Sequence, residues 1–465
     1  MAAVATNGHA NGHTDNIVDG KSPSDGLNYL PPSFYDQFLS QAAKERKPSP
    51  IRGLFPLEKK PGVLSLLAGK PNAATFPFTS LSFTIRSPQD PTQEVPITVD
   101  PNDLAAGLQY GDTAGLAPLL DWFCGLQGHS HGRKKTDHWR ISTGSGSQDL
   151  IYKAVHALVD HGDPVLVESP VYAGVIPLFK TFHCDQIEVD TDADGICSSS
   201  LRDILENWPA GKPKPKVLYT VPYGCNPTGM TATTQRRKEV LELSRKHNFL
   251  ILEDDPYYFL YYGKTERPPS YFTLEMEEPE VGRVLRFDSL SKILSAGIRI
   301  GFASGPVALL DAMDMHTGTS NLQVSSFTQV VTLALVKSWG YDNFILHTER
   351  VSQFYREKRD IFEAALRRHL DGLVQWETPE AGMFFWFKLL MNAPGDASVD
   401  EGDSEDLIRN KAYEEGVLAL PGTVFLPNGR KTSYVRAAFS LSTEEQVNEA
   451  LRRLRVVLLK ERDGR

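Results

Sequence analysis

Short apolar runs alternate with helical patterns through the middle of the chain, from about residue 139 to residue 304. The runs cover residues 139–141, 164–167, 217–221, 249–252, 284–287 and 298–303. Each has the length of a buried strand, and the segments between them carry apolar residues at helical spacing. Such alternation is typical of a mainly parallel sheet covered by helices on both faces. The pattern predicts an α/β domain whose ligands bind where the strands end.

The chain on either side of this region has a different pattern. Residues 31–55 combine an amphipathic helical spacing with an extended, proline-rich stretch, and we interpret them as an arm leading into the fold. Beyond about residue 323 a long helical pattern precedes further strands and helices, and residues 392–406 have the composition of a surface loop. We expect four parts, namely a disordered tail (1–28), the arm with part of a small domain (29–75), a large domain (76–325) and a small α+β domain (326–465).

The charge balance argues against some classes of function. The 465 residues include 49 basic and 58 acidic ones, a net charge of -9, without a long basic block that could follow a nucleic-acid backbone. No uninterrupted apolar stretch approaches the length of a membrane span, and the first 28 residues lack the apolar core of a signal peptide. We expect no nucleic-acid partner, no membrane and a cytoplasmic location.

The four cysteines are scattered without a CxxC pair, which favours a reducing compartment over a disulfide framework or a zinc knuckle. A metal site built from Cys124, His129 and His131 would have a spacing that matches no established site. We expect no metal.

A lysine follows the apolar run 284–287 closely, in the motif Ser289-Leu-Ser-Lys292, and Arg299 comes seven positions later. A lysine considered alone is usually a solvated cation. This one follows a buried strand among small hydroxyl residues, which is a poor match to a solvated surface. The interpretation depends on what other segments bring to the same edge of the sheet.

Three of those segments end a strand-like run with chemically useful side chains. Ser147 and Gln148 open a helix after residues 139–141, where free N–H groups form an anion site, although a glycine turn with a serine cap would look the same. Asn226 begins an Asn-Pro-Thr-Gly turn after residues 217–221. Three successive carboxylates, beginning at Glu253, follow residues 249–252, and one of them could keep a pyridine nitrogen protonated.

Taken together, these segments resemble the fold-type I aminotransferases that depend on pyridoxal 5'-phosphate (PLP), in the branch of kynurenine/2-aminoadipate and fungal aromatic amino acid aminotransferases. The resemblance runs from about residue 31 to the C-terminus. The motifs that carry it are Pro48-Ser-Pro-Ile-Arg52, Leu67-Ala-Gly-Lys-Pro-Asn72, Leu108-Gln-Tyr110, Asn226-Pro-Thr-Gly229, Glu253-Asp-Asp-Pro-Tyr-Tyr258, Ser289-Leu-Ser-Lys292 and Tyr434-Val-Arg436. It implies a large PLP-binding domain with a mainly parallel seven-stranded sheet between helices, and a smaller α+β domain.

The resemblance also implies a role for each matching residue. Lys292 would bind the cofactor covalently and later move a proton between substrate and cofactor. Asp255 would pair with the pyridine nitrogen, Tyr258 and Asn226 would bond the phenolic oxygen, and Tyr172 would stack on the ring. The phosphate would be held by Ser147, Gln148, Ser289, Ser291 and Arg299, with Tyr110 reaching it from the second subunit of a homodimer. The substrate would be bound by Arg436 at its α-carboxylate, by Asn226 and Tyr110, and by Arg52 and Gly69 around its side chain.

The implied reaction moves the amino group of an L-amino acid to 2-oxoglutarate or another 2-oxo acid. The branch favours aromatic donors, which are phenylalanine, tyrosine, tryptophan or kynurenine, and leaves 2-aminoadipate or a broad range open. Lys70 and Cys225 depart from the branch's usual motifs, and Lys70 puts the substrate preference in doubt. A lyase or decarboxylase of the same fold is the second hypothesis. A PLP-sensing transcription regulator, the third, would need an N-terminal DNA-binding domain for which the tail has no room.

Overall fold

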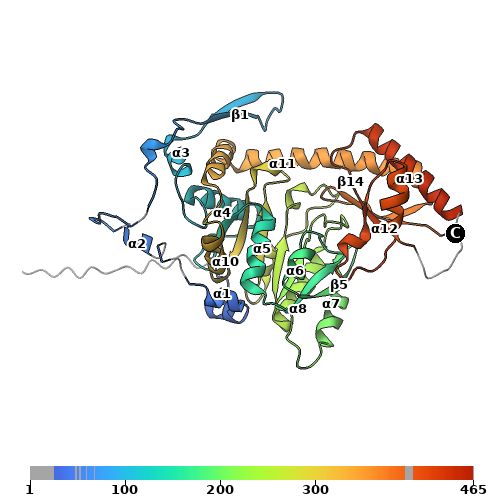
Figure 1. Cartoon of the computed structure of the whole chain (residues 1–465), viewed down its shortest axis with the longest axis horizontal. Coiled ribbons are helices and arrows are strands. Elements are labelled where there is room, and N and C mark those ends of the chain that lie inside the picture. Colours follow the sequence, from blue (N-terminus) through green and yellow to red (C-terminus); the bar gives the residue numbers. More distant parts are fainter. Residues whose placement is uncertain are drawn as a thin grey trace, which may run out of the picture.

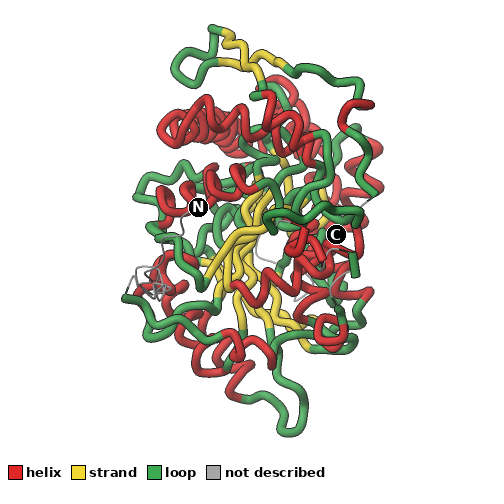
Figure 2. The backbone as a smooth tube through the Cα atoms, turned by 90° about the vertical axis from the view of Figure 1, so that its left-hand side faces the viewer, coloured by secondary structure: helices red, strands yellow, loops and turns green. Residues whose placement is uncertain are grey.

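The computed structural model describes residues 26–47, 50–51, 54–58, 60–67, 69–392 and 402–463, and a sheet of eight strands lies at its centre (Figure 2). Across this sheet the strand order is β3-β10-β9-β8-β7-β4-β5-β6. The bounds are β3 Trp139–Gly144, β4 Pro164–Ser169, β5 Asp185–Asp192, β6 Gly195–Ile196, β7 Val217–Thr220, β8 Leu250–Asp254, β9 Val284–Ser289 and β10 Gly301–Pro306. Strands β5, β4, β7, β8 and β9 pair in parallel, whereas β10 is antiparallel to both of its neighbours.

Helices cover both faces of this sheet, as the views in Figures 1 and 2 show. They are α4 Ala117–His131, α5 Ser147–Leu158, α6 Ile176–Thr181, α7 Ser198–Glu206, α8 Thr234–His247, α9 Tyr271–Leu274 and α10 Val307–Ser320. Every residue of β4, β7, β8, β9 and β10 is buried, which explains their nearly continuous apolar sequences. The predicted α/β fold class is confirmed.

The sheet differs from the expectation at one edge. Strand β6 has only two residues and pairs antiparallel with β5, so it adds an eighth strand to the seven expected. Strand β5 has the sequence DQIEVDTD, which alternates buried and exposed positions. A strand near the edge of a sheet is covered on one side only, so its other side carries polar residues. A pattern of continuous apolar runs therefore does not identify it.

A second, smaller sheet forms the core of the C-terminal part. Its strands, in the order β11-β12-β14-β13, are β11 Val374–Trp376, β12 Phe384–Leu389, β14 Tyr434–Ala438 and β13 Leu420–Pro421. The helices of this part are α11 Ser326–Leu370, α12 Ser404–Asp406, the π-helix η7 Leu407–Ala412, the 3-10 helix η8 Gly422–Phe425 and α13 Glu444–Asp463. Helix α11 runs along both parts (Figure 1) and is interrupted by non-helical backbone at Gly340. Its first half packs on the large core and its second half on the small one, so the predicted boundary at 325/326 remains a prediction.

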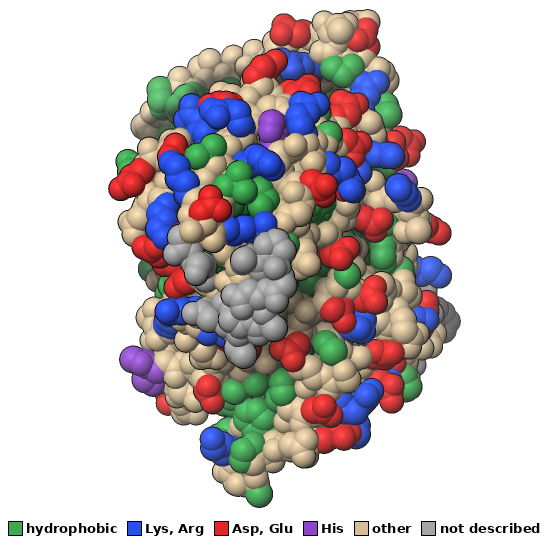
Figure 3. Space-filling model, turned by 90° about the vertical axis from the view of Figure 1, so that its right-hand side faces the viewer, with side chains coloured by type: hydrophobic (Ala, Val, Ile, Leu, Met, Phe, Trp, Pro, Cys, Tyr) green, Lys and Arg blue, Asp and Glu red, His purple; other side chains and the backbone are tan. Residues whose placement is uncertain are grey.

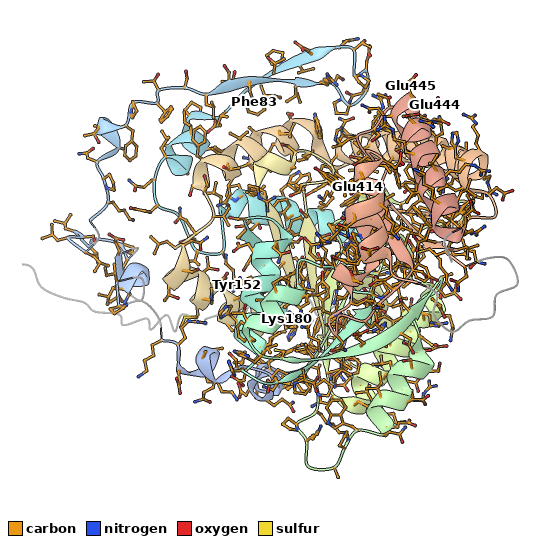
Figure 4. All side chains as sticks on the ribbon, turned by 45° about the vertical axis from the view of Figure 1, so that its right-hand side comes forward. Phe83, Tyr152, Lys180, Glu414, Glu444 and Glu445 are labelled. Atoms are coloured by element: carbon orange, nitrogen blue, oxygen red, sulfur yellow. The ribbon has the colours of Figure 1, made fainter. Side chains whose placement is uncertain are left out.

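The N-terminal segment extends from the body. It includes η1 Pro32–Gln37, α1 Gln41–Glu45, α2 Phe55–Glu58, η3 Ala73–Thr75, the hairpin β1 Ser82–Arg86 with β2 Glu94–Thr98, and α3 Pro101–Gly107. The helix expected within residues 31–55 is therefore broken into short pieces. Figure 4 shows the hairpin, with Phe83, along the top of the molecule. Most of the tail predicted for residues 1–28, and residues 393–401 of the predicted loop, lie outside the described residues.

None of the helices in the described ranges is both long and apolar enough to cross a membrane. On the face that Figure 3 displays, basic and acidic side chains are interspersed. That face offers no broad basic surface of the kind that binds nucleic acid.

Candidate active site

The first part of the site is the N-terminus of α5, where the chain turns sharply after β3. Gly146 has a φ of +85°, and a Cβ there would lie 2.3 Å from Nη2 of Arg299. Arg299 donates through Nη2 to the backbone oxygen of Ser145 at 2.7 Å and through Nη1 to Ser291 Oγ at 3.0 Å. A guanidinium, hydroxyl groups and the free N–H groups of Ser147 and the next residues therefore converge. This arrangement fits a phosphate group.

Lys292 lies on the turn that follows β9. Ser289, the last residue of that strand, accepts a hydrogen bond at its Oγ from the backbone N–H of Ser291 at 3.2 Å, which tightens the turn. Burial lowers the pKa of Lys292, and the positive charge of Arg299 lowers it further. A larger share of its amine is then neutral at neutral pH, and only the neutral amine can bond to a carbonyl carbon or accept a proton.

The three carboxylates at the end of β8 point to two different sides. Glu253 and Asp255 both reach the buried guanidinium of Arg286, with Glu253 Oε2 at 3.4 Å from its Nη1 and Asp255 accepting a short hydrogen bond from the same nitrogen. Asp254 lies on the opposite face and accepts a hydrogen bond from the hydroxyl of Tyr219 at 2.7 Å. Side chains alternate along a strand, so neighbouring positions cannot share one environment.

Asp254, and not Asp255, faces the site. The Oδ1 atoms of Asp254 and Asp255 are both buried without a hydrogen-bond partner among the described residues, but it is the charge of Asp254 that acts on Tyr172 and Tyr257. Burial raises the pKa of this carboxyl to about 7, against hydrogen bonds from Tyr219 and Ser147 that lower it. The assignment of the pyridine partner to Asp255 is therefore corrected, because Asp255 is occupied by the ion pair with Arg286.

The same shift by one residue applies to the tyrosines. Tyr258 donates its hydroxyl to the backbone oxygen of Ser130 at 3.0 Å, and Arg267 covers its ring at 3.9 Å. Tyr257 is buried, and its pKa is raised by burial and next by the charge of Asp254, while Arg436 opposes the rise. The structure thus places Tyr257, and not Tyr258, beside the groups of the site.

The small domain contributes Arg436, from β14. Its Nη1 donates to Asn226 Oδ1 at 2.8 Å, so the arginine and the amide of the Asn-Pro-Thr-Gly turn are held together. Its Cζ lies 4.3 Å from the ring centroid of Phe384 and 5.2 Å from that of Phe425. The Nε atom is buried without a partner among the described residues. A half-buried guanidinium with an unused donor fits a carboxylate ligand.

Tyr172 lies three residues beyond β4. Burial raises the pKa of its phenol, and the negative charge of Asp254 adds to the rise. Gly174 gives this ring its space, because a Cβ at that position would lie 2.5 Å from the ring. The predicted stacking residue is therefore close to Asp254, on the site's side of the sheet.

Two further predicted residues, Tyr110 and Gly69, are not brought to this cluster. Tyr110 lies between α3 and α4 and is 56% exposed. Gly69 is exposed, with no atom within 4 Å of a Cβ built on it, and the nearby Lys70 ammonium is 3.8 Å from Glu58. Arg52 lies outside the described residues. Their roles remain predictions.

The assembled groups fit PLP. The unpartnered oxygen of Asp254 matches a protonated ring nitrogen, the α5 terminus with Arg299 matches the phosphate, and Lys292 follows β9, which lies between β3 and β8 in the spatial order of the sheet. Sequence reasoning missed Gly146, Tyr219, Asp254 and Tyr257. The signal for Asp254 was the strand alternation of β8, and that for Gly146 was its place directly before a helix.

Comparison with known proteins gives a consistent result. The family model "Aminotransferase class I and II" matches residues 102–454. "Aminotransferase tdiD" of Emericella nidulans is 42% identical over 418 residues, which cover 90% of this chain and 94% of the relative. "Kynurenine/alpha-aminoadipate aminotransferase, mitochondrial" of Bos taurus is 38% identical, with 90% and 98% covered. The crystal structure of the aromatic aminotransferase Aro9 from C. albicans superposes with a TM-score of 0.80 at 26% identity, covering 92% of this chain and 98% of that one.

Proposed function

Because this chain belongs to the class I and II aminotransferases, we propose that it moves the amino group of an aromatic L-amino acid to 2-oxoglutarate. The protein is a PLP-dependent aminotransferase, and the finer statement concerns its donor and acceptor. The observation that carries the proposal is the hydrogen bond between Arg436 and Asn226 across the two domains, together with Tyr257, on which the charges of both Asp254 and Arg436 act.

Each residue has a defined task. When bound, PLP supplies a ring that withdraws electrons from the substrate α-carbon, so that the proton on this carbon becomes removable. Lys292 Nζ accepts that proton and returns it, for which its lowered pKa suits it. Asp254 would keep the ring nitrogen protonated, and Tyr257 and Asn226 would hold the phenolic oxygen by hydrogen bonds. Arg436 binds the α-carboxylate and so fixes which bond of the α-carbon is activated.

Aromatic rings around Arg436 support an aromatic donor. Phe384 and Phe425 lie under the guanidinium, and Tyr172 and Tyr257 act on its charge from nearby. The names of similar proteins add kynurenine and 2-aminoadipate to the candidates. The lyase or decarboxylase alternative has no comparable support.

The test is a half-reaction followed by visible spectroscopy. Each candidate, L-phenylalanine, L-tyrosine, L-tryptophan, L-kynurenine, L-2-aminoadipate or L-glutamate, is added to the cofactor-loaded protein without an oxo acid. Loss of the cofactor's visible band, restored by 2-oxoglutarate, is the expected result, with aromatic donors reacting fastest. Faster conversion by 2-aminoadipate than by every aromatic donor would overturn the aromatic preference. Release of carbon dioxide or an amine would favour the lyase.

We further propose a cytoplasmic homodimer. Several apolar side chains in the N-terminal segment are exposed, among them Leu64 at 96%, Leu66 at 102% and Phe78 at 55%. Exposed apolar side chains that gather in one segment support a contact with another chain, and Tyr110 lies just beyond that segment. The four cysteines are unpaired, which is compatible with a reducing compartment. Sedimentation equilibrium and localisation of a tagged protein test the two statements.

A further inference from the structure

Four polar side chains bridge the two domains outside the groups used above. We name Ser169, Glu188, Asn428 and Arg430 the closure latch. Arg430 donates through Nη1 to Glu188 Oε2 and through Nη2 to Ser169 Oγ at 2.8 Å. Asn428 Nδ2 donates to Glu188 Oε1 at 2.7 Å, and Ser169 Oγ donates to Glu188 Oε2. The latch therefore joins the end of β4 and the middle of β5 to the loop that precedes β14; Figure 1 labels β5 and β14.

Glu188 is the centre of this latch. Its side chain is only 10% exposed, whereas that of Arg430 is 54% exposed. Burial by itself raises the pKa of Glu188, but the hydrogen bonds from Ser169 and Arg430 outweigh burial and lower it. Glu188 is thus ionised at neutral pH, and its charge is satisfied by donors from both domains.

The latch adjoins two parts of the substrate site. On the large-domain side, Ser169 is followed by Pro170 and then by Val171, whose backbone N–H donates to the oxygen of Phe425 at 2.9 Å across the interface. Tyr172 comes next. On the small-domain side, Phe425 is buried and lies under Arg436. A displacement at the latch therefore reaches Tyr172 and Arg436 through directly bonded or contacting residues.

An open cleft beside the latch reduces the direct packing between the two domains, so the latch bonds form a larger part of their interface there. A cleft of about 1090 Å³ separates the domains beside the latch, and its lining includes Ser169, Arg430, Thr228, Trp386 and Tyr434. Where such a cleft lies, the facing surfaces of the two domains are not packed against each other. Relative motion of two domains is expected unless their interface is large and apolar, so polar bonds across this interface bias the balance between open and closed forms.

We propose that Glu188 and Arg430 are positioning residues that hold the domains closed and so set the affinity of Arg436 for the substrate carboxylate. The inference rests on the proposed function of Arg436. If only a fraction of the molecules is closed, the apparent Kd for the ligand is the Kd of the closed form divided by that fraction, because the open form presents an incomplete site. The hydrogen bonds of the latch reach neither Lys292 nor the phosphate-binding groups at the N-terminus of α5, so cofactor content should stay near that of the unaltered protein even if Tyr172 shifts.

The test uses the cofactor-loaded protein and the variants Arg430→Ala, Arg430→Lys and Glu188→Gln. Arg430→Ala should raise KM for both the amino acid and the oxo acid about fivefold to tenfold, since a half-exposed charged hydrogen-bond pair is lost. Its kcat and cofactor content should stay near those of the unaltered protein. Arg430→Lys should recover part of the affinity because it keeps the charge. Arg452→Ala, which removes an ion pair with Glu449 on one helix, is the matched control and should leave KM unchanged.

Hydrogen exchange supplies a second readout. The peptide that contains the Val171 amide should exchange faster in Arg430→Ala and Glu188→Gln, because this amide is bonded across the interface. Unchanged KM, or unchanged exchange in that peptide, overturns the latch. A fall in kcat without a rise in KM also overturns it. Absence of amino transfer by the unaltered protein would instead contradict the proposed function, and the exchange result would still decide whether the latch holds the domains.

Discussion

The two neighbouring carboxylates at the end of β8 offer the sharpest test of the site. Asp254 and Asp255 are both fully buried, adjacent in sequence and of the same size. They differ in their partners, since Asp255 bonds Arg286, whereas Asp254 bonds Tyr219 and is the acid whose charge acts on Tyr172 and Tyr257. We predict that Asp254→Asn abolishes most of the activity and that Asp255→Asn does not.

The magnitude follows from the burial of Asp254. Its pKa rises from the ordinary value of 3.8 to about 7, which corresponds to about 4 kcal/mol against the ionised form. When the cofactor binds, the positive charge of its protonated ring nitrogen would offset this cost of ionising Asp254. The ionised carboxylate would in turn stabilise the proton on that nitrogen. Removing the carboxylate loses a stabilisation of the same order, so kcat/KM of Asp254→Asn should fall about 10³-fold.

Asp255→Asn has a different expected result. Arg286 faces the three carboxylates of Glu253, Asp255 and Asp288, so two negative charges remain after the substitution. The asparagine oxygen can still accept the hydrogen bond, and the repulsion among the acids becomes weaker. We expect kcat/KM to stay within about threefold of the unaltered protein.

Both variants are assayed with L-phenylalanine and 2-oxoglutarate, and their cofactor content is measured after release in alkali. Circular dichroism and Tm show whether each variant is folded. A thousandfold loss in Asp255→Asn together with near-normal turnover in Asp254→Asn would refute the reasoning from strand alternation and restore the assignment made from the sequence.

Three further predictions concern the same site. Lys292→Ala should abolish both sustained turnover and the visible band of the bound cofactor while leaving the circular dichroism spectrum unchanged, and near-normal turnover would contradict the role of Lys292. Arg436→Ala should raise KM for the amino acid and the oxo acid by about a hundredfold with cofactor content unchanged, since a charged hydrogen-bonded pair with the carboxylate is lost; loss of cofactor alone would argue against it. In the cofactor-free protein the raised pKa of Asp254 means that its contribution to stability is full below about pH 4 and is lost as the pH rises through about 7. The Tm of the unaltered protein should therefore fall relative to that of Asp254→Asn over this interval, and parallel pH profiles would contradict the burial of this group.

Much of the large domain could be predicted because its central strands are buried on both faces. Strands β4, β7, β8 and β9 are buried at every position and each contains a short apolar run, so their positions in the chain can be recognised from the sequence alone. Strand β5 was not predicted because its exposed side carries polar residues, so its sequence contains no continuous apolar run. The arm was predicted as a helix from its spacing, but the segment forms only short pieces, and such pieces depend on tertiary contacts that a spacing pattern does not contain.

The site shows where motif spacing stops being sufficient. The spacing of three residues between the acid and the tyrosine holds for Asp254 with Tyr257 as well as for Asp255 with Tyr258, so it cannot choose between them. The choice depends on which face of β8 is turned to the ligand, and the sequence contains one clue to it. Arg286 lies within an apolar strand and must be neutralised there, because an unpaired buried charge is very unfavourable.

Glu253 and Asp255 lie on one face of their strand, so together they can meet that requirement, whereas Asp254 cannot join them. Once Arg286 has taken both, Asp254 is the acid that remains for a ligand. The buried ion pair of Arg286 with Glu253 and Asp255 thus determines which carboxylate is left to pair with the ligand. This dependence explains why the structure shifts the roles predicted for Asp255 and Tyr258 by one residue. Their placement depends on Arg286, a buried charge on the neighbouring strand β9.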